Sequence, residues 1–256
     1  MNKIKEAFAK GKAIIPYITC GDPDLATTGA AIRAAAANGA DMIALGIPFS
    51  DPTAEGPVLQ ESSLRALYGG TTTDRVFEFV REIRTDVKMP IVFVTYANVV
   101  FSYGSERFIA LCREVGIDGL MVQDLPFEER YEFLNECHQY HVELIHQITT
   151  SSEARIEMIA KDAEGMVCVS VMANDGENYS HMCGRLAHVT ERIKACTDVP
   201  CIICYNCAQP HEARMLAQIS DGLLIATQSV EALAALGKAA PEKIGADIAE
   251  VRKAID

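Results

Sequence analysis

Short apolar runs rich in valine and isoleucine recur along the chain, and longer segments of mixed polarity separate them. Several runs are continuously apolar, as in Ile91-Val92-Phe93-Val94, which is typical of parallel strands buried on both faces. Eight runs predict strands: Ala13–Thr19, Met42–Pro48, Pro90–Tyr96, Gly119–Asp124, Val142–Thr149, Gly165–Met172, Pro200–Asn206 and Gly222–Gln228.

The segments between these runs have the spacing of amphipathic helices. Between Asp74 and Val87, for example, Val76, Phe77, Val80 and Ile83 share one helical face. The predicted helices are Leu25–Asn38, Asp74–Val87, Ser105–Val115, Glu128–Tyr140, Glu153–Ala163, Arg185–Ala195, His211–Ile219 and Glu242–Ile255. A short helix over Asn2–Ala9 would precede the first strand and close the N-terminal end of the sheet.

Strand and helix alternate eight times in 256 residues, which predicts an α/β fold, a (β/α)8 TIM barrel. A doubly wound open sheet is the alternative, but it usually has fewer strands and a glycine-rich first turn. Because no linker or low-complexity tract divides the chain, we expect a single domain over residues 1–256.

The composition and net charge of the chain limit the kinds of molecule that it can be expected to bind. Apolar residues make up 49% of the chain, and 35 acidic residues outnumber 23 basic ones, for a net charge of −12. This balance argues against a nucleic acid or an anionic membrane as the partner, although backbone N–H groups could still bind a small anion. No apolar run reaches the length of a membrane span and Met1–Lys12 is charged, so we expect a cytoplasmic protein.

In such a barrel the active site forms at the C-terminal ends of the strands. The loop after the second predicted strand, Gly46–Pro57, contains three prolines and two glycines and carries Asp51 and Glu55. It is either a structured turn whose carboxylates cap the next helix, or a rigid loop that holds a carboxylate over the barrel mouth.

Several of these loops resemble those of one known family. Leu45-Gly46-Ile47-Pro48-Phe49-Ser50-Asp51-Pro52, followed by Ala54-Glu55-Gly56-Pro57, closely resembles the signature of the tryptophan synthase alpha chain. Pro16–Thr19 with Gly21–Pro23, Thr95–Asn98, and Gly116–Gly119 with Asp124–Pro126 resemble three further segments of that family. The resemblance implies a barrel that cleaves indole-3-glycerol phosphate to indole and glyceraldehyde 3-phosphate, without a cofactor of its own. It also implies a partner, a pyridoxal-phosphate beta chain that receives the indole, near the loop of Asp51 and Pro52.

The chain departs from the family where the resemblance implies catalysis. The family's acid/base glutamate falls at Ala44, and its loop aspartate, which holds the indole nitrogen, falls at Glu55. Its tyrosine, counted back from Ser170, falls at Val167, with Met166 and Cys168 on either side. A methyl group cannot move a proton, so we expect the lyase activity to be weak or lost.

The phosphate-binding positions differ as well. The resemblance places them at Gly176, Asn206, Ala226 and Thr227, and Asp175 adds a negative charge where a phosphate dianion would bind. Thr227 keeps a hydroxyl that could cap the next helix. The substrate pocket is expected to include Tyr17, Tyr96, Asp124 and Tyr205.

Nine cysteines in a reducing compartment are expected to be buried small hydrophobes, with no metal site. Cys201, Cys204 and Cys207 have the spacing C-x-x-C-x-x-C, but a strand would send Cys201 and Cys204 to opposite faces. A soft metal at the barrel mouth, held by two or three of Cys20, His181, Cys183 and Cys207, is an alternative. His146 is expected to be a satisfied core histidine, with a base in a cavity as the alternative.

Three functional hypotheses remain open at this point. The first is an alpha-chain homologue that binds a small-molecule substrate at the C-terminal face, with weak or absent lyase activity. The second is a non-catalytic barrel that binds and regulates a beta chain. The third is a barrel refitted for a different small ligand.

Overall fold

The computed structural model describes residues 3–149, 152–170, 179–205 and 209–256. Its nine parallel strands form one sheet in the order β5-β4-β3-β2-β1-β9-β8-β7-β6. The strands are β1 (Ala13–Thr19), β2 (Ile43–Gly46), β3 (Ile91–Thr95), β4 (Gly119–Val122), β5 (Glu143–Leu144), β6 (His146–Thr149), β7 (Val167–Ser170), β8 (Cys201–Cys204) and β9 (Gly222–Ile225).

The strand predicted over Val142–Thr149 is divided into two short strands. β5 pairs with β4, and β6 pairs with β7, so the two pieces join the ends of the sheet. Ile145 lies between them, and its N–H donates to the carbonyl of Leu120, 2.8 Å away. The nine strands therefore form a nearly closed barrel, and the predicted TIM-barrel fold is confirmed.

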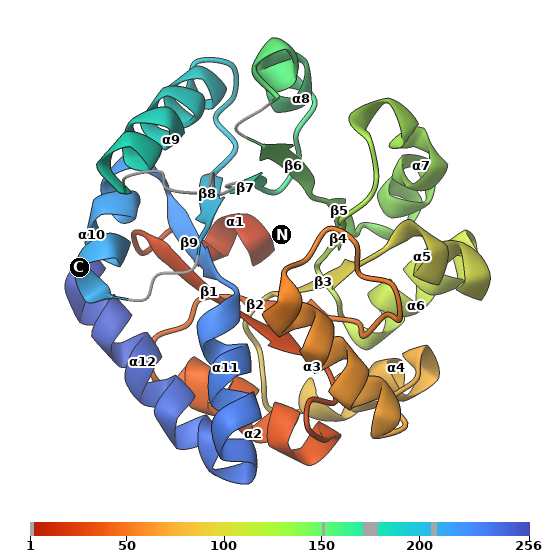
Figure 1. Cartoon of the computed structure of the whole chain (residues 1–256). Coiled ribbons are helices and arrows are strands. Elements are labelled where there is room, and N and C mark those ends of the chain that lie inside the picture. Colours follow the sequence, from red (N-terminus) through yellow and green to blue (C-terminus); the bar gives the residue numbers. More distant parts are fainter. Residues whose placement is uncertain (1–2, 150–151, 171–178, 206–208) are drawn as a thin grey trace.

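Helices surround the strands, except for α1, which lies in the middle of the ring (Figure 1). They are α1 (Lys3–Ala7), α2 (Leu25–Ala37), α3 (Pro57–Tyr68), α4 (Thr73–Ile83), α5 (Ala97–Tyr103), α6 (Ser105–Val115), α7 (Tyr131–Tyr140), α8 (Ile156–Lys161), α9 (Tyr179–Lys194), α10 (Pro210–Ile219), α11 (Thr227–Leu236) and α12 (Ala240–Ile255). Short 3-10 turns cover Phe127–Glu129, Glu153–Arg155 and Gly237–Ala239. No described helix is long and apolar enough to cross a membrane.

Alternation along the strands divides the buried side chains into two clusters. On β1, Ile14 and Ile18 face outward and pack with the helices, whereas Ile15 and Tyr17 face into the barrel. Ile4 of α1 joins the inner cluster and closes the N-terminal end, as predicted. It packs so close to Gly119 that a Cβ there would lie 3.0 Å from its Cδ1.

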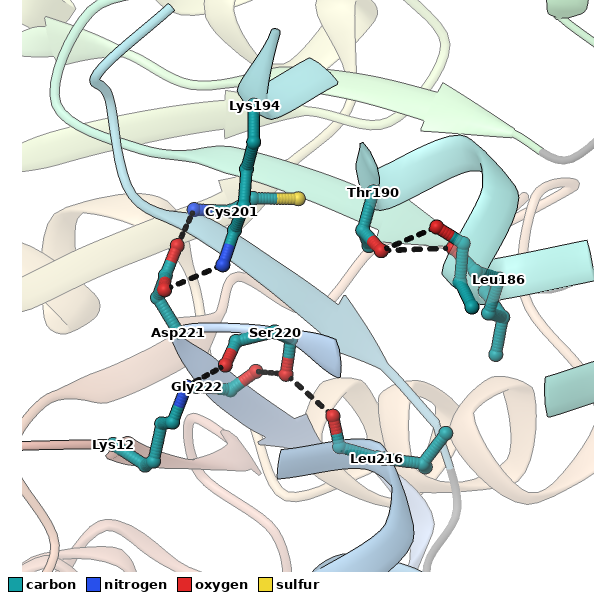
Figure 2. Close-up of polar contacts among 10 residues, drawn as sticks. Lys12, Leu186, Thr190, Lys194, Cys201, Leu216, Ser220, Asp221 and Gly222 are labelled. Atoms are coloured by element: carbon teal, nitrogen blue, oxygen red, sulfur yellow. Dashed lines mark hydrogen bonds and ion pairs between the residues drawn. The ribbon is translucent and has the colours of Figure 1, made fainter. Parts of the chain in front are cut away.

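Half-buried carboxylates join neighbouring strands at this N-terminal end. The carboxylate of Asp221, just before β9, accepts the N–H of Cys201 at 2.9 Å and the ammonium of Lys194 at 2.7 Å (Figure 2). Asp41 before β2 accepts the N–H of Ile14 in the same way, and Asp118 before β4 accepts that of Ile91. Because backbone N–H groups at strand ends need partners, these carboxylates stabilise the closed end of the barrel.

Candidate active site

A cavity of about 370 Å³ lies at the C-terminal ends of the strands, where active sites of this fold form. Its lining is mainly apolar, with contributions from Val94, Met121 and Leu224. The polar groups on its wall are Tyr17, Glu55, Gln123, Gln147, Cys168, Ser170, Cys204, Tyr205 and Thr227. An apolar cavity with a few polar groups is typical of a small-molecule site.

The loop between β2 and α3 holds Glu55 at the wall of this cavity. The N–H of Ala54 donates to the hydroxyl of Tyr96 at 3.2 Å, and the amide of Gln60 donates to the carbonyl of Glu55 at 2.8 Å. Burial raises the pKa of Glu55 to about 7. The carboxyl group can therefore accept or donate a proton near neutral pH.

The carboxylates of this loop do not cap the following helix. The N-cap of α3 is Gly56, with no side-chain hydrogen bond. Asp51 is exposed and accepts the hydroxyl of Ser50, while Pro52 is buried. The interpretation as a loop that holds Glu55 at the barrel mouth agrees with this geometry.

The tyrosine position needs a correction of one residue. Val167 of β7 faces outward into the cluster under the helices, so it cannot reach the cavity. Its neighbour Cys168 faces inward and lines the cavity wall. On this strand Cys168 and Ser170 line the cavity, and neither carries a phenol.

Ala44 of β2 also faces inward, in register with Tyr17 on β1 and Val92 on β3. It is buried in the inner cluster and is not among the residues that line the cavity. The hydroxyl of Tyr17 lies over the next inward position, Gly46, where a Cβ would be 2.0 Å from its oxygen.

Of the four expected pocket residues, Tyr17 and Tyr205 line the cavity, whereas Tyr96 and Asp124 lie outside its wall. Asp124 is exposed and accepts the N–H of Ala97 at the start of α5, while Tyr96 stacks on Phe49. On the cavity wall, the side-chain N–H of Gln147 donates a hydrogen bond to the side-chain oxygen of Gln123 at 2.8 Å. Side chains alternate between the two faces of a strand, so counting along the two predicted strands could have indicated that both glutamines face the cavity.

The far side of the cavity is formed by Tyr205, Ala226 and Thr227. Ala226 is the N-cap of α11 and has no side-chain group that could cap the helix, which begins with Thr227 at the cavity wall. Gly176 and Asn206, expected to bind phosphate, and Asp175 lie outside the described residues.

The two cysteines of β8 lie on opposite faces of the strand, as the alternation of side chains predicted. Cys201 belongs to the outer cluster, and Cys204 packs on the inner one. Among the described residues, no three His, Cys, Asp or Glu side chains form a group that could hold a metal. Cys207, from the alternative soft-metal site, lies outside that part of the chain. His146 is buried with its ring against Phe127, and burial lowers its pKa.

Comparison with known proteins agrees with this geometry. A sequence profile described as "Tryptophan synthase alpha chain" matches residues 3–254. The chain belongs to the tryptophan synthase alpha chain family. The alpha chain of Lacticaseibacillus casei is 40% identical over 257 residues, which cover 100% of this chain and 96% of that protein. That of Alkaliphilus metalliredigens is 41% identical over 225 residues, covering 88% and 84%.

Solved structures of this family share the whole fold. The alpha subunit from Legionella pneumophila superposes with a TM-score of 0.90 at 28% identity, covering 100% of this chain and 99% of that one. Tryptophan synthase from M. tuberculosis, at 24% identity and a TM-score of 0.88, supports the fold alone. The chain is thus a homologue of the tryptophan synthase alpha chains, a family of tryptophan biosynthesis.

Proposed function

We propose that this chain is a cytoplasmic alpha-chain homologue whose indole-3-glycerol-phosphate lyase activity is weak or absent. The observation that carries the proposal is the acid/base content of the cavity. Of the described residues that line it, Glu55 is the only carboxylate. The resemblance implies a glutamate at the position of Ala44 and a tyrosine at that of Val167, and the inward neighbour of Val167 is Cys168, so no phenol stands there in either register.

The implied reaction needs more than one proton transfer. Retro-aldol cleavage requires a proton on the ring carbon that loses its side chain and the removal of a proton from the side-chain hydroxyl. Glu55, with a pKa raised to about 7, can hold the indole N–H and can act in one transfer. The methyl group of Ala44 can act in none. General acid–base groups contribute roughly 10²–10⁴-fold each.

Substrate binding is supported by the cavity itself. Its volume of about 370 Å³ and mainly apolar wall suit a planar aromatic ring. The N-terminus of α11 lies at the cavity wall, and the dipole at a helix N-terminus favours an anion there. We therefore propose that the ligand is a small molecule with an apolar body and an anionic end.

The test is the steady-state rate of indole formation from indole-3-glycerol phosphate by the purified chain. The alpha chain of Lacticaseibacillus casei, assayed in parallel, is the matched control. We expect a rate at least about 10³-fold below that control, from the loss of acid–base groups. A rate within tenfold of the control would contradict the proposal.

A second function rests on the β2–α3 loop. Asp51 is exposed beside the buried Pro52, in a loop anchored through Tyr96. In the family this loop lies near the beta chain, so we propose that the chain can bind and regulate such a partner. A pull-down and a beta-chain activity assay, with and without Asp51→Ala, test it. We expect the variant to bind the beta chain more weakly than the parent does. If neither protein binds the beta chain, this second function is contradicted.

A further inference from the structure

Two glutamine side chains are hydrogen-bonded to each other on the cavity wall. Gln123 follows β4 directly, and Gln147 lies within β6. Both line the cavity, and the side-chain N–H of Gln147 donates to the side-chain oxygen of Gln123 at 2.8 Å. Neither amide has a role in the proposed lyase function.

The backbone holds both glutamines where the sheet changes from β5 to β6. Gln147 is in register with Cys168 of β7, which also faces inward. The backbone N–H of Gln123 donates to the carbonyl of Thr95 at 2.9 Å. Because β4 pairs with β5 and β6 pairs with β7, the bond between the glutamines joins two strands that flank this change. The two amides therefore have fixed places on the wall.

The bond between the glutamines leaves part of each amide open. It occupies an N–H of Gln147 and the oxygen of Gln123. Within the described part of the chain, no other group bonds to either side-chain amide, so the N–H groups of Gln123 and the oxygen of Gln147 stay available. Rotating both amides by half a turn exchanges these roles but still leaves one donor beside one acceptor. The pair thus offers the same pattern to a ligand in either arrangement.

The position of the pair decides which edge of a ligand it meets. Between β2, whose following loop carries Glu55, and β6, the sheet order places β3, β4 and β5 on one side and β1, β9, β8 and β7 on the other. The two strands therefore stand on opposite sides of the barrel. An indole ring whose N–H is held by Glu55 turns its hydrocarbon edge toward the glutamines, and that edge can pair with neither amide.

The open groups favour an uncharged ligand that carries a donor and an acceptor side by side. A ligand that fills the cavity displaces water from both amides, and a buried polar group without a partner is costly. A site built to hydrogen-bond its ligand therefore rejects the analogue that lacks the bonding groups. A carboxylate offers only acceptors and an ammonium only donors. A lactam, a cyclic amide with adjacent N–H and C=O groups, matches both.

We propose that Gln123 and Gln147 make this cavity selective for planar lactams over indole. The lactam carbonyl accepts from the amide of Gln123, and the lactam N–H donates to the oxygen of Gln147. This inference rests on the proposed ring-binding cavity and adds which ring the cavity prefers. It involves no covalent step.

Calorimetric titration of the parent protein at pH 7 tests the selectivity. The probes are indole, isoindolin-1-one, which fuses a lactam to the same benzene ring, and N-methylisoindolin-1-one, which lacks the N–H. We expect a Kd for isoindolin-1-one at least about tenfold below those of the other two. If indole binds as tightly as the lactam or more tightly, the inference is overturned while the ring-binding cavity stands. If none of the three binds, the ring-binding cavity itself is contradicted, and the inference with it.

Replacement of the glutamines tests their part. Gln123→Met and Gln147→Met each keep the length of the side chain and remove the amide. Each should raise the Kd for isoindolin-1-one about tenfold and leave that for indole within about threefold. Gln218→Met, at an exposed position of α10, is the matched control and should change neither Kd. Urea unfolding confirms that each variant is folded. A folded double variant that still prefers the lactam would refute the role of the pair.

Discussion

Replacement of Asp118 by asparagine should strongly destabilise the closed end of the barrel. Its carboxylate accepts the N–H of Ile91 at 3.0 Å and the guanidinium of Arg84 at 2.6 Å. The two side chains are only 12% and 11% exposed. Burial lowers the pKa of Arg84, and the neighbouring Asp118 carboxylate opposes that shift.

The size of the effect follows from that burial. Breaking one side of a buried ion pair costs about 3–5 kcal/mol, because the other charge is left without compensation. Arg84 would keep hydrogen bonds to the carbonyls of Met89 and Gly116, each 2.5 Å long. Asparagine can still accept the N–H of Ile91. We therefore expect Asp118→Asn to lower the free energy of unfolding by about 3 kcal/mol, the bottom of that range.

Asp221→Asn is the matched control, since Asp221 accepts a strand N–H in the same way (Figure 2). Its partner Lys194 is 39% exposed and Asp221 itself 31%, so the ion pair should contribute only about 0–1 kcal/mol. Urea unfolding of both variants, analysed at a shared m-value, measures the difference. If Asp118→Asn costs no more than Asp221→Asn, burial does not set the strength of these carboxylate contacts.

Two further predictions concern the cavity. Burial raises the pKa of Glu55 from 4.5 to about 7 in the folded chain, so its ionisation opposes folding as the pH rises. Glu55→Gln should therefore gain stability relative to the parent between pH 4.5 and 7.5, by up to about 3 kcal/mol; an equal difference in urea midpoints at pH 4 and pH 8 would contradict this. Ala44→Glu combined with Cys168→Tyr should produce detectable indole from indole-3-glycerol phosphate, while the parent stays at background. A double variant that folds and binds substrate without forming indole would favour a reshaped cavity over lost acid–base groups.

The sequence predicted the strands well because each is a short apolar run between turn-forming residues. The runs at Ala13–Thr19 and Ser105–Val115 match β1 and α6 at both ends. Helices α3 and α11 were not predicted, because some of the side chains that they bury against the barrel are polar. Ser62, Ser63 and Ser229 are buried there, so the apolar stripe that marks a helix is interrupted.

The site was harder to predict for a related reason. Residues Met166–Val169 of the seventh strand are all apolar or thiol-bearing, so no alternation indicates which side faces the barrel. Only the register with β6 and β8 decides this, and it depends on contacts far apart in the sequence. Counting from a motif therefore gave Val167, whereas the inward residue is Cys168.

Contacts at the N-terminal end of this barrel stabilise the fold, whereas the cavity lies at the C-terminal end. At the N-terminal end, Asp41, Asp118 and Asp221 each join a strand N–H to a cationic side chain, and Ile4 fills the interior. None of these contacts involves the cavity, so its wall can change without loss of the fold. Cys168→Tyr places a phenol on that wall, so urea unfolding of this variant tests the separation: a free energy of unfolding close to the parent's is expected, and loss of the fold would show that the wall and the fold are not independent.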